Sequence, residues 1–536
     1  MSTAKKFSCF VAGFLLAAGF TSAATVTGMV KGPDGMPFKG AFVEAQNSAT
    51  KITVDVLSAP DGRYRIDNLA VGEYDLRIRA IGYKADPKSG VKLTAKENSS
   101  ADFALQTGMV RWADLSGYQG KQLLPDGKGK QLITRQCFAC HMFQSRMAAV
   151  KRDHDGWVQA VTFMRTVMHS RLADVFNDQD AITVENYLND AFGVDSKLPK
   201  SPAEMPEYQK TVRPVANDAL NIVYVEYDMP GPNRMPFSAT PAPDGSIWIP
   251  DFGPANRIGH LDPKTGHIDE YVVPNKGTAS IHSVILAPDG SVWGAEQASN
   301  KLARLDPKTK QITEYQDTYA PGMQGLENGG SKHTVRADSK GRVWGTAVNA
   351  PLTVFDPKTG EFTHFKDVIS PYGVEIDKNG NAWFAEFREG GEIGFAEADS
   401  GKVQRFAMPT PGGWPRRIEI APDGMIWVAE YRGGRIDRFD PNTHAFKEYK
   451  LPGPDPTPYA LGIDQHGNIW YSSDDMDVMG RLDPKTGNIT EYPYVHAENM
   501  MKEFFMDKQG HMWYGSAPNN KVGYFYLAGG NEHAAN

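Results

Sequence analysis

Cys137, Cys140 and His141 form a C-x-x-C-H motif, which is the most chemically distinctive grouping in the chain. The sequence has three cysteines, and the third, Cys9, lies in an apolar N-terminal run. Two thiols cannot complete a four-thiolate zinc site, and a thioredoxin-like redox pair would leave His141 unexplained. At this spacing, two thiols add to the vinyl groups of haem and the adjacent histidine binds the iron. The motif therefore predicts one haem c, attached through Cys137 and Cys140, with His141 on the iron.

The second axial ligand of this iron is expected to be a methionine, because a thioether stabilises the reduced state of an electron carrier. Met164 is the first choice and Met168 the second, and both lie on one face of a predicted helix. Either can instead be a core side chain, since methionine packs irregular gaps well. His154 and His169 are the third choice and would give a bis-histidine haem of low potential.

The N-terminal residues carry signals for export. Lys5 and Lys6 precede an apolar run, residues 7–20, that is too short to span a membrane, and small residues follow up to Ala24. We expect residues 1–24 to be a cleaved signal peptide and the mature protein to be periplasmic. The net charge of −7 and the lack of a sustained basic run argue against a nucleic-acid partner. No later segment is long and apolar enough for a membrane span.

The composition, with 53 glycines and 36 prolines, predicts a mostly β protein, and three regions separate along the chain. Residues 25–106 contain short strands, at 25–30, 41–45, 64–66 and 74–79, divided by turn signals. The elements Gly28-x-Val30, Asp61-Gly62-x-Tyr64-x-Ile66 and Leu69-x-x-Gly72-x-Tyr74 resemble the carboxypeptidase regulatory-like domain. The resemblance implies a small β-sandwich. Such a domain sometimes binds carbohydrate and more often serves as a passive folding or docking module.

Residues 108–200 are predicted to be helical around the C-x-x-C-H motif. Trp157, Val161, Met164 and Met168 share one face of a helix after the motif. A later helix places Ala181, Val184 and Leu188 in an apolar stripe. This order of elements resembles small cytochrome c domains, in particular the haem domains of quinohaemoprotein amine dehydrogenases, in whose pattern Met164 matches the methionine.

Residues 220–527 are a repeat whose most regular element is Gly-x-apolar-Trp, recurring every 39 to 51 residues. The seven tryptophans are Trp248, Trp293, Trp344, Trp383, Trp427, Trp470 and Trp513. Tight turns divide each period into four short strands, which predicts a seven-bladed β-propeller. The last unit has only three strands of its own, and residues 222–227 are expected to complete it and close the ring. The tryptophans are interpreted as structural, one between each pair of sheets.

The units Gly424-Met-Ile-Trp427-Val-Ala-Glu430 and Gly487-Asn-Ile-Thr-Glu-Tyr492 resemble the virginiamycin B lyase family, which is a seven-bladed propeller. In that family, a Glu-Pro-His run in the last blade supplies a magnesium ligand and the general base, and a later Glu completes the metal site. Here the matching stretches are Met500-Met501-Lys502 and Ser516-Ala517-Pro518. They contain neither the base nor the carboxylates, so streptogramin lyase activity is not expected.

Two sets of residues are predicted to lie around one mouth of the propeller channel. Eight residues before each turn glycine stand Phe237, His282, His333, Tyr372, Arg416, Tyr459 and Lys502. Three residues after each tryptophan stand Asp251, Glu296, Ala347, Glu386, Glu430, Ser473 and Ser516. This mixture suits a polar ligand, and His282, His333 and Glu296 together could bind a divalent metal ion. The alternative is that a channel mouth is polar because it is wet.

The sequence therefore predicts a β-sandwich, a monohaem cytochrome c domain and a seven-bladed propeller in one exported chain. The expected function is electron transfer with a periplasmic redox partner, either a dehydrogenase or a soluble cytochrome. The propeller would bind a small substrate and oxidise it, or dock the partner enzyme. Two alternatives stay open, a metal-dependent lyase of the virginiamycin B lyase type and a non-enzymatic haem sensor or carbohydrate-binding protein. If the protein is an enzyme, an oxidoreductase is favoured over a C–O lyase.

Overall fold

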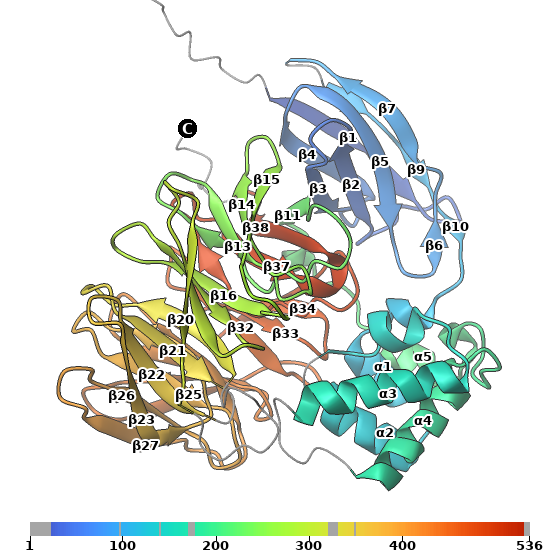
Figure 1. The fold of residues 1–536 in the computed structure, drawn as a ribbon. Coiled ribbons are helices and arrows are strands. Elements are labelled where there is room, and N and C mark those ends of the chain that lie inside the picture. The colour runs from blue at the N-terminus through green and yellow to red at the C-terminus, as the bar shows by residue number, and fades with distance from the viewer. Residues whose placement is uncertain are drawn as a thin grey trace, which may run out of the picture.

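A computed structural model describes residues 23–95, 98–138, 141–169, 177–319, 331–347 and 350–529, apart from the side chains of residues 166–169. Most of the predicted signal peptide, Cys140, and the side chains of Met168 and His169 lie outside the described residues. Figure 1 shows a β-sandwich, a group of helices and a ring of sheets. Within the described residues, none of the helices combines the length and apolar character that crossing a membrane requires.

The N-terminal part is a two-sheet sandwich of short strands. Its strands are β1 (Ala24–Lys31), β2 (Phe42–Asn47), β3 (Thr53–Leu57), β4 (Arg63–Leu69), β5 (Gly72–Arg79), β6 (Tyr83–Lys84), β7 (Lys88–Leu93), β8 (Asn98–Ser100), β9 (Phe103–Ala104) and β10 (Gln106–Thr107). One sheet has the order β4-β1-β8, and β3-β2-β5-β7 belong to the other. Val26 and Ile66 of the first sheet pack with Val43 and Leu76 of the second. Each strand that the sequence predicts here is present.

The helical part follows the sandwich. Its elements are η1 (Trp112–Asp114), α1 (Gly117–Leu123), α2 (Lys128–Leu132), η2 (Ile133–Cys137), η3 (Gln144–Ala148), α3 (His154–His169), α4 (Asp178–Phe192), η4 (Pro202–Glu204), α5 (Tyr208–Thr211) and η5 (Asn217–Ala219). The Asn177 side chain caps α4 by accepting a hydrogen bond from the Asp180 amide. The predicted stripe of Ala181, Val184 and Leu188 is buried on this helix. Trp157 and Val161 of α3 join the same core.

The remaining strands form seven four-stranded blades. Blades one to three are β12 (Thr240–Pro241), β13 (Ile247–Pro250), β14 (Arg257–Asp262), β15 (His267–Val272); β16 (Ile281–Leu286), β17 (Val292–Glu296), β18 (Lys301–Leu305), β19 (Ile312–Gln316); and β20 (Lys332–Ala337), β21 (Val343–Ala347), β22 (Pro351–Asp356), β23 (Glu361–Ile369). Blades four to six are β24 (Pro371–Ile376), β25 (Ala382–Glu386), β26 (Glu392–Ala396), β27 (Val403–Ala407); β28 (Pro415–Ile420), β29 (Ile426–Glu430), β30 (Arg435–Phe439), β31 (Phe446–Lys450); and β32 (Pro458–Ile463), β33 (Ile469–Ser473), β34 (Val478–Leu482), β35 (Ile489–Pro493). Blade seven is β36 (Phe505–Met506), β37 (Met512–Ser516), β38 (Lys521–Leu527) and β11 (Ile222–Asp228).

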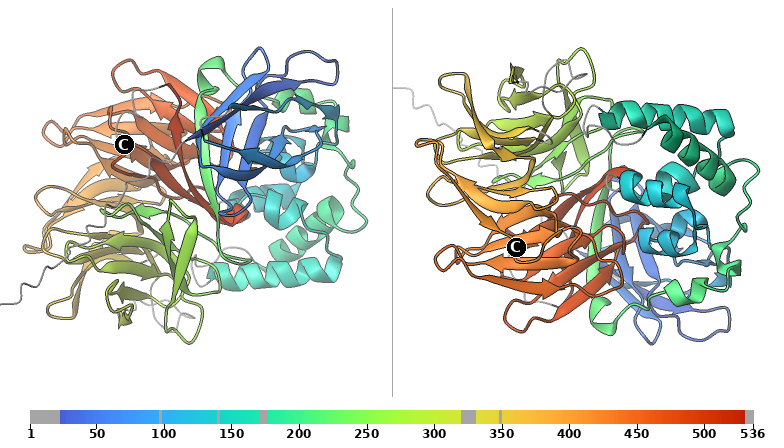
Figure 2. Two further views of the ribbon diagram at one scale, coloured as in Figure 1. Left: turned by 90° about the horizontal axis from the view of Figure 1, so that it is seen from above. Right: turned by 90° about the horizontal axis from the view of Figure 1, so that it is seen from below.

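Blade seven closes the ring as the sequence predicts. β11 pairs antiparallel with β38 from Ile222 opposite Leu527 to Asp228 opposite Lys521. Its other edge pairs with β3 of the sandwich, with Val223 opposite Val56 and Glu226 opposite Thr53. Half of the sandwich and the last blade therefore form one continuous eight-stranded sheet. Both views of Figure 2 show the sandwich lying directly beside the last blade.

The seven repeat tryptophans are buried, in agreement with a structural role. Trp248 of blade one packs with Val284 and Val292 of blade two. The indole of Trp513 also donates a hydrogen bond of 2.8 Å to the carboxylate of Asp507, six residues earlier in the turn. The indoles of Trp344, Trp383 and Trp470 make the same bond to an aspartate six residues earlier, so these tryptophans anchor a turn as well as pack between blades.

Candidate functional site at the mouth of the propeller

Backbone bulges in the innermost strands aim one set of side chains at the channel. In blades two to six, the pairing of the first strand with the second shifts register, as between Pro415 and Ile418. The shifts enclose His282, His333, Tyr372, Arg416 and Tyr459. A bulge bends the strand and redirects a side chain, and bulges are common beside functional sites. The repeated bulge explains why these side chains converge.

The histidine side of this ring is a stack of aromatic groups. The rings of Phe237 and His282 have centroids 5.0 Å apart, and those of His282 and His333 are 3.6 Å apart. His333 lies 4.0 Å from Tyr372. Burial lowers the pKa of His333 well below its usual value, and the neighbouring His282 adds to this effect. A neutral imidazole is therefore favoured at His333, as close stacking on a second imidazole requires.

The cationic side of the ring is built around Arg416. Its guanidinium carbon lies 3.5 Å from the ring centroid of Tyr459 and 4.2 Å from that of Tyr431. It also donates a hydrogen bond of 3.0 Å to the phenol oxygen of Tyr372, which is hydrogen-bonded to the Tyr459 phenol. Lys502 lies 4.0 Å from the Tyr459 ring. A buried cation held on several aromatic faces is a rigid element, because each face contributes attraction without competing water.

The second predicted set lies at the same end of the strands, with Glu296 opposite Ile281 and Glu430 opposite Pro415, but its carboxylates contact other groups. Glu296 accepts hydrogen bonds from Asn275 and Ser299, within its own part of the ring of blades. Glu386 pairs with Arg388 and Arg405. The carboxylate of Glu430 lies beside Gly413, where a Cβ atom would be only 2.4 Å from it. Hence, within the described residues, His282, His333 and Glu296 do not bring their ligand atoms together as a metal site.

Side chains one position later reach the ring instead. Phe252, Phe387, Tyr431 and Asp474 each stand four residues after a blade tryptophan. Phe252 stacks at 4.5 Å on Phe237, and Asp474 lies 3.9 Å from the amine of Lys502. Successive side chains of a strand point to opposite faces, so a shift of one residue exchanges the two sets. The sequence signal existed, but the expected position was one residue too early.

The described residues in and just after the C-x-x-C-H motif lie against this same mouth. Tyr431, whose ring contacts Arg416, donates a hydrogen bond of 3.4 Å to the carbonyl oxygen of Phe138. Glu498, in the connection between blades six and seven, accepts a hydrogen bond of 2.8 Å from the amide of Ser145. Met500 packs into the apolar core of the helical part, with Phe138 and Phe143. The motif and the ring therefore share one contact region, which sequence reasoning did not predict.

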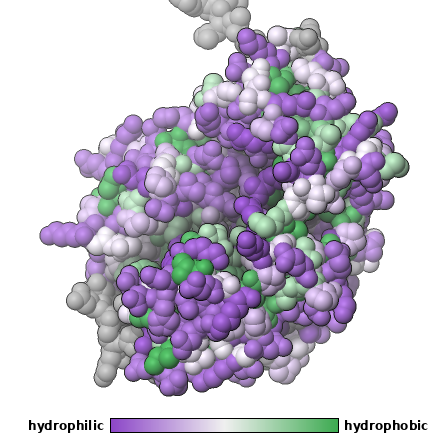
Figure 3. Space-filling model, turned by 90° about the vertical axis from the view of Figure 1, so that its right-hand side faces the viewer, coloured by the Kyte–Doolittle hydropathy of each residue, from purple (hydrophilic) through white to green (hydrophobic). Residues whose placement is uncertain are grey.

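A salt bridge fixes the same contact from the side of α1. Lys121 lies 2.7 Å from a carboxylate oxygen of Asp475 and 2.8 Å from one of Asp455. The backbone amide of Tyr118 also donates a hydrogen bond to the carbonyl oxygen of Asp475. The face in Figure 3, which is the right-hand side of Figure 1, is mainly hydrophilic, with scattered hydrophobic residues.

His141 is oriented as an iron-binding histidine needs to be. Its Nδ1 atom lies 2.7 Å from the carbonyl oxygen of Met142, so the Nδ1–H tautomer leaves Nε2 as the lone-pair donor. Burial lowers the pKa of His141, which favours the neutral, ligating form. Cys137 is half-buried beside the apolar core that contains Phe138 and Phe143. These residues fit a haem attached at this motif.

The proposed distal ligands are only partly described. Met164 is half-buried on α3, and the side chains of Met168 and His169 lie outside the described residues. His154 stands exposed at the start of α3, with Nε2 3.2 Å from the side-chain oxygen of Asn186. The exposed position and this contact make His154 a poorer choice than Met164 for a ligand in an apolar haem pocket.

Comparison with known proteins supports two of the three parts. Residues 25–106 match the carboxypeptidase regulatory-like domain family, and residues 326–533 match the virginiamycin B lyase family. No curated protein is significantly similar to the chain. Among solved structures, selenomethionine-substituted virginiamycin B lyase from Staphylococcus aureus is 24% identical, with a TM-score of 0.51, over 57% of this chain and 99% of that one.

Two further structures give the same result. A streptogramin B lyase structure is 24% identical with a TM-score of 0.51, over 58% of this chain and 100% of that one. A catalytically inactive variant of the Staphylococcus aureus lyase, solved with quinupristin, has the same identity and score, over 57% and 99% of the two chains. At this identity, the likeness shows a shared fold. The chain therefore combines a carboxypeptidase regulatory-like domain with a virginiamycin B lyase-like propeller.

Proposed function

We propose that the protein is an exported c-type haem protein that transfers electrons, and that its propeller mouth binds the electron donor or a partner enzyme. Cys137 and Cys140 would hold the haem, with His141 and Met164 on the iron. When bound, the haem would supply one-electron exchange. The observation that carries the proposal is the contact of Tyr431 with both Phe138 of the motif and Arg416 of the ring.

The ring residues would orient a polar ligand beside the motif. Arg416 and Lys502 offer positive charge, while the rings of Tyr372 and Tyr459 supply flat apolar surface. Such a combination of convergent polar groups and aromatic walls is typical of small-molecule sites. A small substrate oxidised at this mouth would stand next to the haem-binding motif. A partner dehydrogenase docked there would likewise have a short path for electrons to the haem-binding motif.

Covalent attachment is tested on the protein made together with haem-maturation machinery. We expect the haem to remain with the polypeptide through acid–acetone extraction and a haemochrome spectrum of the c type. Cys137→Ala and Cys140→Ala should each abolish stable attachment, whereas Gln131→Ala, an exposed change on α2, should not. Complete extraction of the haem from the wild type would contradict the proposal.

The source of the electrons is tested separately from attachment. Turnover of a small substrate with artificial electron acceptors would identify a substrate oxidase site. Reduction of the haem only in the presence of a dehydrogenase would identify a docking platform. In either case, Arg416→Ala should slow reduction of the haem without releasing it. A reduction rate unchanged in Arg416→Ala would remove the ring from the proposal.

The match of residues 326–533 suggests a second candidate function, a lyase of the virginiamycin B type. Ring opening requires a positioned base and a cation, and Met500, Met501 and Pro518 provide neither. We therefore expect no linear product when the protein is incubated with a type B streptogramin and magnesium, as judged by mass spectrometry. Efficient linearisation that survives Lys502→Ala but is lost in His282→Ala would show a lyase site in another blade.

A further inference from the structure

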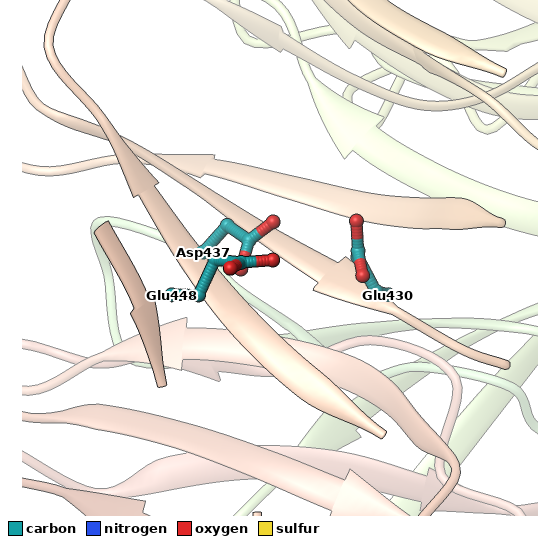
Figure 4. Close-up of side chains that lie close together, drawn as sticks. All are labelled: Glu430, Asp437 and Glu448. Carbon is teal, nitrogen blue, oxygen red and sulfur yellow. The ribbon is translucent and has the colours of Figure 1, made fainter. Parts of the chain in front are cut away.

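Blade five contains three carboxylates that no other function described above uses. Glu430 ends β29, Asp437 lies in β30, and Glu448 lies in β31, directly opposite Asp437. One ligand oxygen from each lies within 4.8 Å of the others. Figure 4 shows the carboxylates of Asp437 and Glu448 together, with that of Glu430 across from them. Three strands of one sheet thus bring their acidic groups to one point.

Asp437 is the unusual member of this group. It is fully buried, and among the described residues no N–H or hydroxyl group donates a hydrogen bond to either of its carboxylate oxygens. A buried carboxylate without such donors costs several kcal/mol unless a proton or a cation neutralises it. Both oxygens of the fully buried Glu430 likewise accept no hydrogen bond from an N–H or hydroxyl group within the described part of the chain. The group is therefore more than a set of acidic residues facing water.

Comparison among the seven blades isolates the same residue. Strand pairing places Gly259, Ala303, Thr353, Gly394, Gly480 and Gly523 at the position of Asp437 in the other blades. The fold at this position therefore requires no carboxylate. Blade five therefore has a buried carboxyl group at a position where the other six blades have a small side chain.

One guanidinium is already present beside the cluster. Arg435 lies 3.3 Å from an oxygen of Glu430 and donates a hydrogen bond of 2.6 Å to Glu448. It also contacts Thr410 at 2.7 Å and the carbonyl oxygen of Gly433 at 3.2 Å. Three carboxylates and one guanidinium leave two negative charges when all the acids are ionised. A divalent cation would balance them.

We propose that Glu430, Asp437 and Glu448 bind a calcium ion in blade five. Carboxylate oxygens are the ligands that hard cations prefer, and the set contains no sulfur or imidazole. Calcium–oxygen distances of about 2.3–2.6 Å place opposite ligands about 4.6–5.2 Å apart, which accommodates the observed spacing. Glu448 is exposed, so water can complete the coordination from that side.

A proton shared between Glu430 and Asp437 is the competing explanation. Burial raises the pKa of Asp437 to about 8, and the nearby charges of Glu430 and Glu448 add to the rise. Burial also raises the pKa of Glu430 to about 7, although Arg435 and the contact with Asp437 oppose the rise. A shared proton neutralises only one charge and binds no ion. The two explanations differ in what calcium does to the protein, because only the first predicts a saturable effect.

The test titrates the full-length protein, freed of metal with a chelator, with calcium chloride at pH 8 by calorimetry and by thermal unfolding. We expect one calcium ion per chain and a higher melting temperature. Asp437→Gly, which installs the residue found in four other blades, should fold, weaken binding at least tenfold and abolish the thermal shift. Asp437→Asn should do the same while keeping the side-chain volume.

The matched control is Glu314→Gln in blade two. Glu314 occupies in blade two the position that Glu448 occupies in blade five. The residue opposite Glu314 is Ala303, whereas the residue opposite Glu448 is Asp437, so blade two lacks the third carboxylate. Calcium binding should be unchanged in this variant. Equal binding in the wild type and Asp437→Gly would overturn the proposal. A second result would also overturn it: calcium has no effect on the wild type, and Asp437→Asn makes the protein more stable. That combination would show that a shared proton, rather than an ion, neutralises the acids.

Discussion

The carboxylate of Glu498 accepts a hydrogen bond of 2.8 Å from the backbone amide of Ser145, which joins the connection between blades six and seven to a residue four positions after His141. Glu498 is almost fully buried. The amide of Ser145 has to exchange this partner for water if the helical part leaves the propeller. Together with the bond from Tyr431 to Phe138, this contact ties the residues around the C-x-x-C-H motif to the propeller.

We predict that Glu498→Ala loosens the contact between the helical part and the propeller. A hydrogen bond to a charged group is worth about 1.5–3 kcal/mol, so the free energy of unfolding should fall by about that amount. Urea denaturation measures the change, and limited proteolysis should cut between the two parts faster. Glu361→Ala, an exposed change on β23, is the control. Identical stability of the two variants would show that the contact is not important in solution.

The aromatic surroundings of Arg416 lead to a second prediction. Arg416→Lys keeps the charge but loses the flat guanidinium that lies on Tyr431 and Tyr459. We expect a loss of about 2 kcal/mol in unfolding free energy, the magnitude of a desolvated cation–π contact. Arg432 contacts the single ring of Trp414 at 3.9 Å, so Arg432→Lys should cost less. An equal effect of the two substitutions would argue against the several-ring arrangement.

A third prediction concerns the distal ligand of the proposed haem. If a thioether binds the iron, the oxidised protein should show a charge-transfer band near the red edge of its visible spectrum. Met164→Leu should remove this band, while Met168→Leu and Met147→Leu, the latter in the buried core, should keep it. Loss of the band in Met168→Leu alone would exchange the two assignments. No band in the wild type would move the ligand to His154 or His169.

The acids of blade five give a prediction on pH. The pKa of Asp437, about 8, and that of Glu430, about 7, lie above their values in an unfolded chain. The folded state therefore holds protons that the unfolded state has released, so this stabilisation is complete below about pH 4 and is lost as the pH rises through 7 and 8. In a calcium chelator, stability should fall between pH 5 and pH 9, by about 1.4 kcal/mol for each pH unit separating the folded and unfolded pKa values.

Urea denaturation across this pH range measures the effect as a difference between variants. The fall should be smaller in Asp437→Gly, because one of the two acids is gone. Asp423→Asn, which removes an exposed carboxylate of the same blade, should follow the wild type. Parallel curves for wild type and Asp437→Gly would show that this pair does not titrate as the structure implies. Excess calcium should flatten the wild-type curve if the ion replaces the proton.

Much of the architecture follows from repeated local patterns in the sequence. The tryptophan spacing predicts seven blades, and the fit of residues 222–227 to a missing strand predicts the closure that β11 makes with β38. The positions of His282, His333 and Arg416 before the turn glycines predict that they meet, because every blade places the same position at the same radius. These features repeat along the chain at a regular spacing, so a single sequence is enough to predict them.

The rest depends on contacts between segments that no local pattern links. Glu430 was expected at the channel, but strand alternation points it toward Gly413, and its neighbour Tyr431 contacts Arg416 instead. The pairing of Tyr431 with Phe138 joins residues 293 positions apart. The pairing of β3 with β11 likewise uses a sheet edge to which many other strands could have hydrogen-bonded. Docking of this kind is set by whole surfaces rather than by spacing.

The eight-stranded sheet has a consequence for the order in which the chain folds. Along the chain, β11 follows the complete sandwich and precedes the first six blades, whereas its partner β38 comes last. Folding domain by domain from the N-terminus lets β3 hold β11 in place as soon as both exist. β11 then stays paired with β3 on one edge, and its other edge stays free until about three hundred following residues have folded. The sandwich thus serves as a built-in template on which the ring finally shuts, and it protects an unfinished edge from wrong partners in the meantime.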